Sequence, residues 1–188
     1  MSRLILASAS PRRRELLLLL DIPFEIIPAV GPEHVPQGAD PEQAVLALSL
    51  AKAREVAQAH SDAVVIGADT VVAVDGAILG KPADEADAAR MLRMLSGREH
   101  QVYTGVTVIK SGETVSRAEM TRVYFRTMTE EEIQTYIATG EPLDKAGAYG
   151  YQGRAGVYVE RIEGDFFNVV GLPLCSLGTM LKELGVIS

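Results

Sequence analysis

Two runs rich in β-branched residues, Ala63–Ile66 and Val71–Val74, are the feature that most constrains the fold of this chain. Such runs predict buried β-strands. The tetrapeptide between them, Gly67-Ala-Asp-Thr70, contains a carboxylate, and we expect it to lie at a strand end or in a bulge. An unpaired Asp69 would be costly in these apolar surroundings, so it should bind a cation, accept hydrogen bonds or act as a base. A common alternative, in which Asp69 only closes a turn through its side chain, stays open.

Further strands and helices alternate along the rest of the chain. Short apolar runs predict strands, and apolar residues at helical spacing predict helices. Capping residues mark helix starts at Ser10 with Pro11, at Asp40, and at Thr129 with Glu132. The predicted elements are a strand at Leu4–Ala7, helices at about Arg12–Leu20, Pro41–His60 and Ala83–Leu95, a hairpin over Gln101–Arg126 turning at Ser111 and Gly112, a helix from Thr129 to Gly140, a strand at Val157–Ile162 and a helix at Leu172–Leu184. This order predicts a single mixed α/β, or α+β, domain over residues 1–188.

Composition and charge limit the possible functions. The chain has 188 residues, of which 47% are hydrophobic, and this is enough to bury one core. A formal charge of −7 argues against a protein that coats nucleic acid, although a small anion could still bind where positive groups gather. The apolar run Leu16–Leu20 is too short for an export signal or a membrane span. We therefore expect a globular, cytoplasmic protein that contacts neither nucleic acid nor membrane.

Cysteine and histidine usage restricts the redox and metal chemistry. Cys175 is the single cysteine, so no intrachain disulfide can form, and a reducing, intracellular compartment is expected. The apolar neighbours of Cys175 predict a place in the core. His34, His60 and His100 lie far apart, without the spacing of zinc ligands. A bound metal should therefore be a hard ion held by carboxylates and phosphate.

The segment Ser8–Arg13 combines two hydroxyls and two guanidinium groups at a predicted helix start. Free backbone N–H groups and the positive end of the helix dipole favour an anion there, and arginine adds bidentate hydrogen bonds to phosphate oxygens. The segment is thus a candidate phosphate-binding loop. A helix cap followed by a solvated basic turn would have the same composition, so both interpretations stay open.

Two lysines and a glycine-rich segment are further candidates. Lys52 lies between alanines on the long predicted helix and could point inward, whereas Lys81 lies in the loop Gly80-Lys-Pro82. Either lysine could contact phosphate, although a single lysine is more often a solvated surface residue. In Gly140–Gly153, clustered glycines allow close approach to a ligand, and the amide of Gln152 could contact a base edge. A tight connection with glycines at positive φ would explain the same composition.

Taken together, these segments resemble the Maf family of nucleotide pyrophosphatases. Each motif is weak alone, but six occur in the family's order and spacing along nearly the whole chain. They are Leu6-Ala-Ser-Ala-Ser-Pro-Arg-Arg13, Gly67-Ala-Asp-Thr70, Gly80-Lys-Pro82, His100-Gln-Val-Tyr-Thr-Gly105, the stretch from Gly140 through Tyr149 to Gly153, and Val169-Val-Gly-Leu-Pro-Leu174.

This resemblance implies a mixed α/β fold similar to that of the inosine triphosphate pyrophosphatases, with two lobes around a central mixed sheet and an active-site cleft. It also implies a cytoplasmic homodimer. The implied reaction is hydrolysis of a nucleoside triphosphate between the α and β phosphates, which yields a monophosphate and pyrophosphate.

The resemblance further implies roles for individual residues. Asp69 matches the position of the proton acceptor, and Glu33 matches an acidic residue associated with metal and water, so these two would hold Mg²⁺ or Mn²⁺. The phosphate-binding set, in which the two lysines also stabilise charge during catalysis, comprises Ser8, Arg12, Arg13, Lys52 and Lys81. Three positions resemble substrate selectors, and this chain carries there Arg12, Thr70 and Gln152. That combination resembles the branch of the family that acts on dTTP and UTP.

The chain departs from the family pattern at three positions. Pro32 stands where members often carry a second acid, Tyr151 where Ile is frequent, and Phe166 where Tyr is more common. Only the first departure affects the chemistry, because it removes an acid from the surroundings of the metal.

Two other functions compete with the enzyme. A regulatory protein could hold nucleotide, or a partner from the division machinery, without turnover, since the family name is linked to septum inhibition. A nucleic-acid binder could use the basic cluster Arg12–Arg14. The second alternative has the wrong net charge, and three adjacent arginines at a helix start cannot all face one groove.

Overall fold

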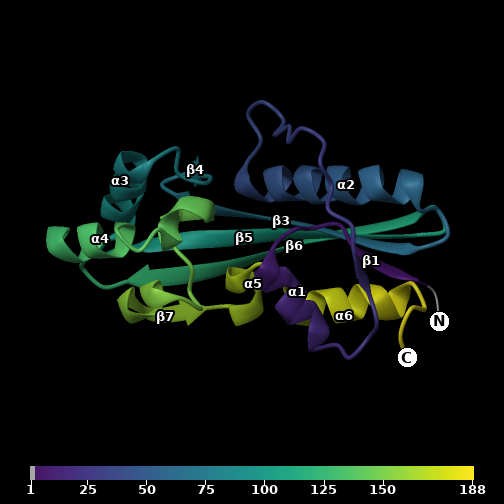
Figure 1. Ribbon diagram of the computed structural model, residues 1–188. Helices are drawn as coiled ribbons and strands as arrows, with labels where there is room; N and C mark the ends of the chain where they lie inside the picture. The colour runs from purple at the N-terminus through teal and green to yellow at the C-terminus, as the bar shows by residue number, and fades with distance from the viewer. Residues whose placement is uncertain (1–2) are drawn as a thin grey trace.

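The computed structural model of the protein, which describes residues 3–188, contains one seven-stranded mixed sheet with helices on both faces (Figure 1). The strands are β1 Leu4–Leu6, β2 Glu25–Ile26, β3 Val64–Val74, β4 Ala77–Leu79, β5 Glu99–Lys110, β6 Glu113–Phe125 and β7 Val159–Glu163. Their order is β2-β1-β3-β5-β6-β7, with β4 paired to β3. β1 pairs in parallel with β2 and β3, and the remaining pairings are antiparallel. The predicted mixed α/β class is confirmed.

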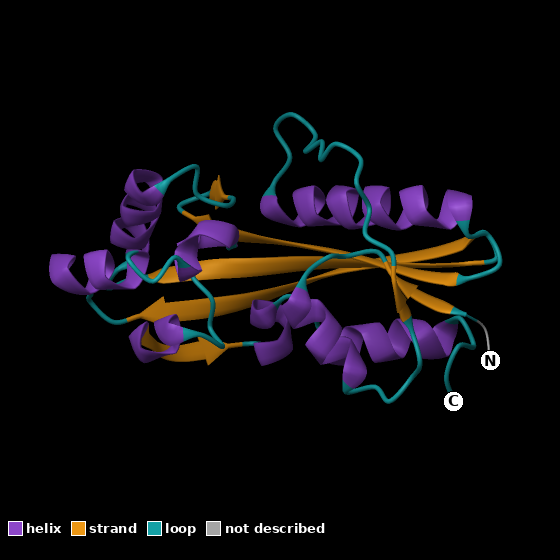
Figure 2. Cartoon of the chain, viewed as in Figure 1, coloured by secondary structure: helices purple, strands orange, loops and turns teal. Residues whose placement is uncertain are grey.

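Six α-helices and three short 3₁₀ helices complete the described chain (Figure 2). They are α1 Pro11–Leu18, α2 Pro41–Ala59, α3 Glu85–Leu95, α4 Glu130–Ile137, α5 Phe166–Val170 and α6 Leu174–Glu183, with η1 Glu141–Asp144, η2 Ala146–Ala148 and η3 Arg154–Tyr158. Helix α2 covers one face of the sheet, while α1, α5 and α6 lie on the other (Figure 1). The predicted caps at Ser10, Asp40 and Thr129 are all confirmed. No helix within residues 3–188 combines the length and apolar character that crossing a membrane requires.

The prediction that Gly67-Ala-Asp-Thr70 ends a strand or forms a bulge is wrong. The tetrapeptide lies inside β3, which runs without interruption for 11 residues. It pairs with β5 throughout, placing Asp69 opposite Gly105 and Thr70 opposite Thr104. Backbone groups make this ladder, so a glycine and an aspartate can continue it where β5 runs alongside.

The C-terminal third also differs from the predicted elements. Residues up to Tyr158 form η3, so the strand predicted at Val157–Ile162 begins later, as β7. The helix predicted at Leu172–Leu184 is confirmed as α6 and begins two residues later, at Leu174, after Pro173. Helix α5, which ends before Gly171 with its φ of 122°, was not predicted. Cys175 is exposed on α6 and is not a core residue. The very short strands β2 and β4 were not predicted.

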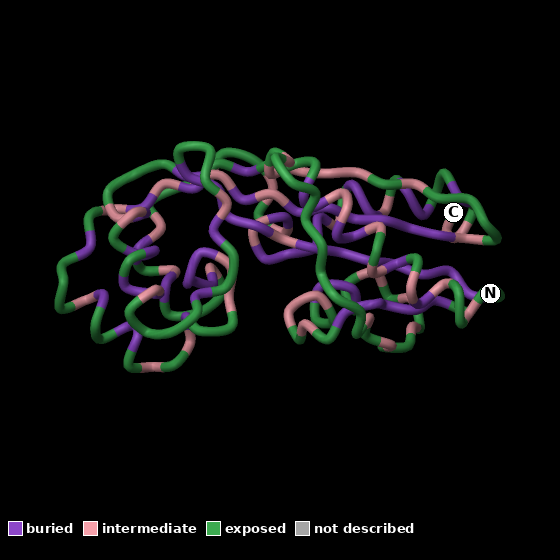
Figure 3. The backbone as a smooth tube through the Cα atoms, turned by 90° about the horizontal axis from the view of Figure 1, so that it is seen from above, coloured by how far each residue is buried: buried purple, intermediate pink, exposed green. Residues whose placement is uncertain are grey.

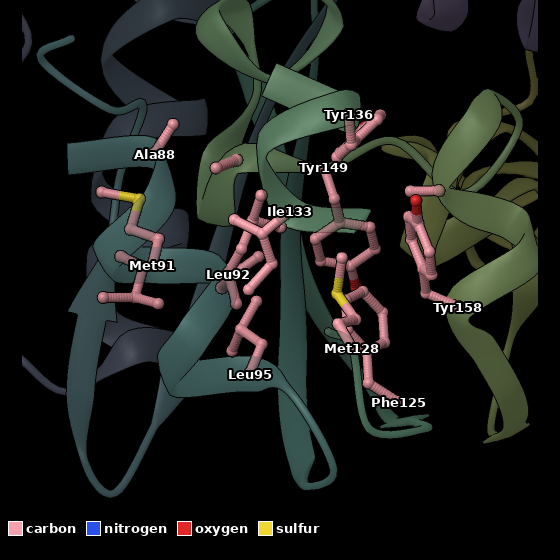
Figure 4. Packing of buried hydrophobic residues seen from close by; sticks show 14 of the residues in the cluster. Ala88, Met91, Leu92, Leu95, Phe125, Met128, Ile133, Tyr136, Tyr149 and Tyr158 are labelled. Atoms are coloured by element: carbon pink, nitrogen blue, oxygen red, sulfur yellow. The ribbon is translucent and has the colours of Figure 1, made fainter. Parts of the chain in front are cut away.

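Buried side chains gather in two lobes that share the long strands. In the first lobe, one cluster lies between the sheet and α1 and α6, and another lies between the sheet and α2. In the second lobe, α3 and α4 enclose a cluster that includes Leu92, Phe125 and Ile133 (Figure 4). Strand β3 contributes Ile66 to the first lobe and Val72 to the second. The buried strands run through both lobes (Figure 3), so the middle of β3 lies at their junction.

Two glycines allow α2 to lie unusually close to the sheet. A Cβ atom on Gly67 of β3 would lie 2.4 Å from the carbonyl oxygen of Ser49, and one on Gly105 of β5 would lie 2.3 Å from that of Val45. Real side chains do not approach backbone atoms so closely. The small residues therefore fix the height of α2 above β3 and β5, and with it the position of any α2 side chain that points at the sheet.

We predict that Gly105→Ala destabilises the protein by about 1–3 kcal/mol or more, because the added methyl group must push the α2 backbone away from the sheet. The control is Gly178→Ala on α6, where a Cβ atom would meet no atom within 4 Å. That change should be neutral or stabilise by about 0.5–1 kcal/mol, since alanine favours a helix. Urea unfolding of both variants measures the difference, and equal stabilities would contradict the close approach of α2.

Candidate active site

A cleft of approximately 620 Å³ opens at the junction of the two lobes. Its walls come from the loops that follow β1 and β2, from α2 and the middle of β3, and from the segment between η1 and η3. Every site residue predicted from the sequence lines this cleft: Ser8, Arg12, Arg13, Glu33, Lys52, Asp69, Thr70, Lys81 and Gln152. The structure thus brings together residues that are distributed over most of the sequence.

The ammonium group of Lys52 lies between two carboxylates at the floor of the cleft. Its Nζ atom is 2.5 Å from Asp69 Oδ1 and 2.8 Å from Glu33 Oε1. The side chains of Asp69 and Lys52 are 12% and 18% exposed, whereas that of Glu33 is 61% exposed. The hydrogen bond and charge of Lys52 lower the pKa of Glu33, with smaller contributions from Lys81 and Arg13. The predicted inward orientation of Lys52 is confirmed.

Strand geometry explains why Asp69 meets α2. Alternate side chains of a strand point to the same face. The face of β3 on which a side chain of residue 67 would lie is the one that α2 covers. Asp69, two residues later, points the same way and reaches Lys52. Thr70 points to the opposite face, toward α1 and α5. The two neighbours therefore serve different halves of the cleft.

The loop that carries Glu33 is attached to α2 by a residue that sequence reasoning missed. Glu55 accepts hydrogen bonds from the backbone N–H groups of Val30, at 2.8 Å, and Gly31, at 3.0 Å. Because Glu55 follows Lys52 by three residues, both lie on one side of the helix. One helix thus holds the loop and also binds the carboxylate that the loop presents. The only sequence signal was this spacing.

Arg13 joins three separate segments on the other side of β3. It donates from Nε to the Gly171 carbonyl oxygen at 2.8 Å, from one terminal nitrogen to Ser8 Oγ at 3.2 Å, and from the other to Thr70 Oγ1 at 2.9 Å. Burial lowers the pKa of this guanidinium, and the charge of Asp69 opposes that shift. The side chain of Arg13 therefore holds together Ser8, Thr70 and Gly171, a network that we call the frame of the cleft.

The hydroxyls that Arg13 contacts have different capacities for a ligand. Thr70 Oγ1 accepts from Arg13 and lies 2.9 Å from Thr104 Oγ1, which itself donates to the Asn168 carbonyl oxygen. The one hydroxyl proton of Thr104 is thus used, so Thr70 donates its own proton to Thr104. Ser8 Oγ accepts from Ser10 N and from Arg13, which leaves its proton for a ligand. Ser8 is the better anion donor of the two.

Other cationic side chains line the cleft and make fewer contacts within the protein than Arg13 does. Within residues 3–188 the side chains of Arg12 and Lys81 make no hydrogen bond or ion pair, and both residues line the cleft. Lys145, which sequence reasoning did not single out, also lines the cleft and binds Asp144 at 2.6 Å. The helix dipole of α1 adds positive potential beside Arg12. An anion with several charged groups fits this distribution.

Gln152 lies at the rim of the cleft and is exposed. The wall behind it is ordered by Tyr149, whose hydroxyl lies 2.7 Å from His100 Nε2. Burial lowers the pKa of His100 to about 3, so this imidazole is neutral near pH 7. His100 therefore supports the wall and carries no charge.

Protein ligands for a metal ion are few in this cleft. Among residues 3–188 no group of three or more His, Cys, Asp or Glu side chains is arranged to hold one. Asp69 and Glu33 are two carboxylates that converge on a single cation, which here is Lys52. Magnesium commonly uses one or two carboxylates and completes its shell with water and substrate phosphates. The residues present fit an ion that arrives with a phosphorylated ligand.

We predict that Arg13→Ala lowers both stability and anion affinity. Its removal leaves the Gly171 carbonyl oxygen without its donor and frees Ser8 and Thr70, which should cost about 1–3 kcal/mol of unfolding free energy. Pyrophosphate affinity, measured by calorimetry, should fall as the loop reorganises. Arg14→Ala, on the exposed side of α1, is the control and should change neither property. Wild-type stability in Arg13→Ala would show that the network is dispensable.

Comparison with known proteins places this arrangement in a family. Proteins named dTTP/UTP pyrophosphatase from Bacillus mycoides (strain KBAB4) and Bacillus cereus (strain AH187) are 51% and 50% identical to this chain. The first match covers 97% of this chain and 96% of the relative, and the second covers 99% and 97%. Among solved structures, the Ham1 protein of Staphylococcus aureus is 16% identical with a TM-score of 0.41, and the match covers 65% of this chain and 71% of that one. The model of the Maf-like protein family matches residues 3–184, and the chain therefore belongs to the Maf family.

Proposed function

We propose that this protein is a nucleoside triphosphate pyrophosphatase that hydrolyses dTTP and UTP to the monophosphate and pyrophosphate. The observation that carries the proposal is the position of Asp69, held by Lys52 at the floor of a cleft whose rim is cationic. Relatives about half identical over their full length are named dTTP/UTP pyrophosphatases, which supports the same reaction. The resemblance also implies a cytoplasmic homodimer.

The phosphate chain would bind along the cationic side of the cleft. Arg12 and Lys81 have donors available, and the Ser8 hydroxyl has a free proton. Arginine suits the planar pairs of phosphate oxygens, whereas lysine acts as a compact point charge. Electrostatic stabilisation of the charge that develops on the leaving pyrophosphate is the largest contribution expected from these residues.

Asp69 is suited to take a proton from the attacking water. Its carboxylate is almost enclosed, and Lys52 orients it through Oδ1, which leaves Oδ2 for the water. The new bond joins the water oxygen to the α phosphorus, and the bond from that phosphorus to the bridging oxygen breaks. Pyrophosphate leaves with the electron pair, and its charge is balanced by Lys52 and Lys81.

The same carboxylates could hold a divalent metal. Asp69 and Glu33 would be the protein ligands of Mg²⁺ or Mn²⁺, with phosphate oxygens completing the shell. When bound, such an ion would neutralise phosphate charge and lower the pKa of a water molecule. Lys52 must then give up at least one of its two carboxylate contacts, and its ammonium becomes available to a phosphate oxygen.

Asp69→Asn should lower kcat by about 100-fold or more, because the amide cannot accept the proton and lacks the negative charge. We predict unchanged far-UV circular dichroism, since the amide keeps the shape of the side chain. Phosphorus NMR of dTTP hydrolysis with Mg²⁺ should show pyrophosphate as the product, and a chelator should stop the reaction. A wild-type protein that binds dTTP without turnover would instead be a regulatory binding protein, and near wild-type kcat in the variant would exclude Asp69 as the base.

Base selection is assigned to the three positions Arg12, Thr70 and Gln152. A neutral amide offers both a donor and an acceptor, as the O4 and N3–H of thymine and uracil require. Thr70 would affect base selection indirectly, by helping to position Arg13, because its hydroxyl is bound to Arg13 and Thr104. Once a nucleotide covers Gln152, a purine would leave the amide partly unpaired, at a cost of about 1–3 kcal/mol.

We predict that the wild-type protein hydrolyses dTTP and UTP well and ATP and GTP poorly. Gln152→Glu should depress dTTP hydrolysis selectively, because a carboxylate cannot donate to O4. Arg154→Ala, an exposed change two residues further along, provides the control. Measuring kcat/KM for each nucleotide decides the question. The series includes 7-methyl-GTP, because the resemblance implies a second branch of the family that acts on it and tends to carry Glu at the position of Gln152. A wild-type value for 7-methyl-GTP above those for dTTP and UTP would refute the base assignment while leaving the pyrophosphatase assignment in place.

A further inference from the structure

Gln152 lies at the tip of a tight turn that the structure holds in place from outside the cleft. Tyr151 and Gln152 are its two central residues, and Gly153 N donates to the Gly150 carbonyl oxygen at 3.0 Å to close it. Tyr151 and Gln152 both line the cleft. A side chain at a turn tip can discriminate between bases only if the turn has a defined position, because a mobile amide would adapt to either partner.

Two side chains fasten both ends of this turn. The hydroxyl of Tyr136, on α4, accepts from Gly150 N at 3.3 Å and donates to Glu141 Oε1 at 2.9 Å. The carboxylate of Glu141 also accepts from Arg154 N, at 3.1 and 3.2 Å from its two oxygens. Tyr136 thus holds the residue at which the turn begins, and Glu141 holds the residue just after its end. We call this pair the Tyr136–Glu141 clamp.

The surroundings of the clamp make it rigid. Tyr136 is 2% exposed within the core of the second lobe, where its ring packs against Tyr158 (Figure 4). Burial raises the pKa of Tyr136, and Glu141 raises it further, so the phenol stays protonated and can donate. A Cβ atom on Gly153 would lie 2.1 Å from Glu141 Oε1, which shows how closely the carboxylate approaches the turn.

We propose that the Tyr136–Glu141 clamp sets the nucleobase preference of the protein by positioning Gln152, although neither residue lines the cleft. The inference rests on the proposed function, in which Gln152 contacts the base. Tyr136 and Glu141 are positioning residues and take no part in the chemistry at Asp69. Loosening the turn should therefore weaken discrimination between bases and leave the phosphate chemistry intact.

Tyr136→Phe and Glu141→Gln test this proposal. The first keeps the buried ring and removes the hydroxyl that joins Gly150 to Glu141, while the second keeps an oxygen acceptor and removes the charge. Tyr158→Phe is the matched control, because it removes a hydroxyl that is not part of the clamp from the same aromatic pair. For each protein, kcat and KM are measured with dTTP and 7-methyl-GTP, together with amide hydrogen exchange at Gly150 and Arg154.

We expect the ratio of kcat/KM between the two nucleotides to fall about fivefold or more in Tyr136→Phe, through a higher KM for the preferred one, with kcat within about twofold. Glu141→Gln should give a smaller change in the same direction, and Tyr158→Phe no change. Exchange at Gly150 and Arg154 should accelerate in both clamp variants. If exchange accelerates and the ratio stays constant, or if kcat falls equally for both nucleotides, the clamp has no selective role.

The wild-type measurements keep this test separate from the proposed function. A wild-type protein that prefers 7-methyl-GTP overturns the assignment of dTTP and UTP, whereas the clamp is judged by the change in the ratio whichever nucleotide is preferred. Should Tyr136→Phe fail to fold, Glu141→Gln gives the same readouts from a side chain outside the core.

Discussion

The ammonium group of Lys52 lies between the carboxylates of Asp69 and Glu33, and much of the architecture serves to bring these three groups together. They come from a helix, a strand and a loop. Two carboxylates at the floor of one cleft would repel each other, and a shared cation removes that repulsion. The arrangement needs α2 close to the sheet, which Gly67 and Gly105 permit. It also needs the loop fastened to α2, which Glu55 achieves.

The alternation of side chains along β3 divides the cleft into two functional halves. Asp69 points toward α2, where charged groups can exchange partners when a ligand enters. Thr70 points toward α1 and α5, where Arg13 links it to Ser8 and to the chain after α5. The proposed chemistry is thus concentrated on one face of the sheet, and the network around Arg13 lies on the other. Because Asp69 and Thr70 are neighbours in one uninterrupted strand, the positions of the two halves relative to each other are set by the backbone of β3.

The sequence predicted the site residues better than their environment. Hydrophobic runs and capping residues predicted most of the elements, and ordered motifs predicted the residues that meet in the cleft. The contacts of Arg13 could not be predicted from local sequence patterns, because Thr70 and Gly171 are 57 and 158 residues away along the chain. The unbroken course of β3 depends on pairing with β5, which no local preference at Gly67 reveals. Helix α5 was not predicted, because its five residues are too few to show an apolar repeat at helical spacing.

The second lobe supplies an ordered wall of the cleft in addition to the charges of Lys81 and Lys145. Its aromatic core holds Tyr136, and through it the turn that carries Gln152, while His100 fixes Tyr149 behind the same wall. This arrangement suits a protein that reacts with one part of a ligand and recognises another part of it. The phosphates would meet the charged floor, and the base would meet the ordered rim.

The sharing of Lys52 between two carboxylates is tested most directly by NMR titration of the Glu33 side-chain carboxyl carbon in the wild type and in Lys52→Met. The structure predicts a Glu33 pKa below its ordinary value in the wild type, since the hydrogen bond and charge of Lys52 favour the ionised form. In Lys52→Met this pKa should rise markedly, because the cation is gone and Asp69 remains nearby. The same Glu33 pKa in both proteins would contradict the account, since Lys52 could not then join the two carboxylates in solution.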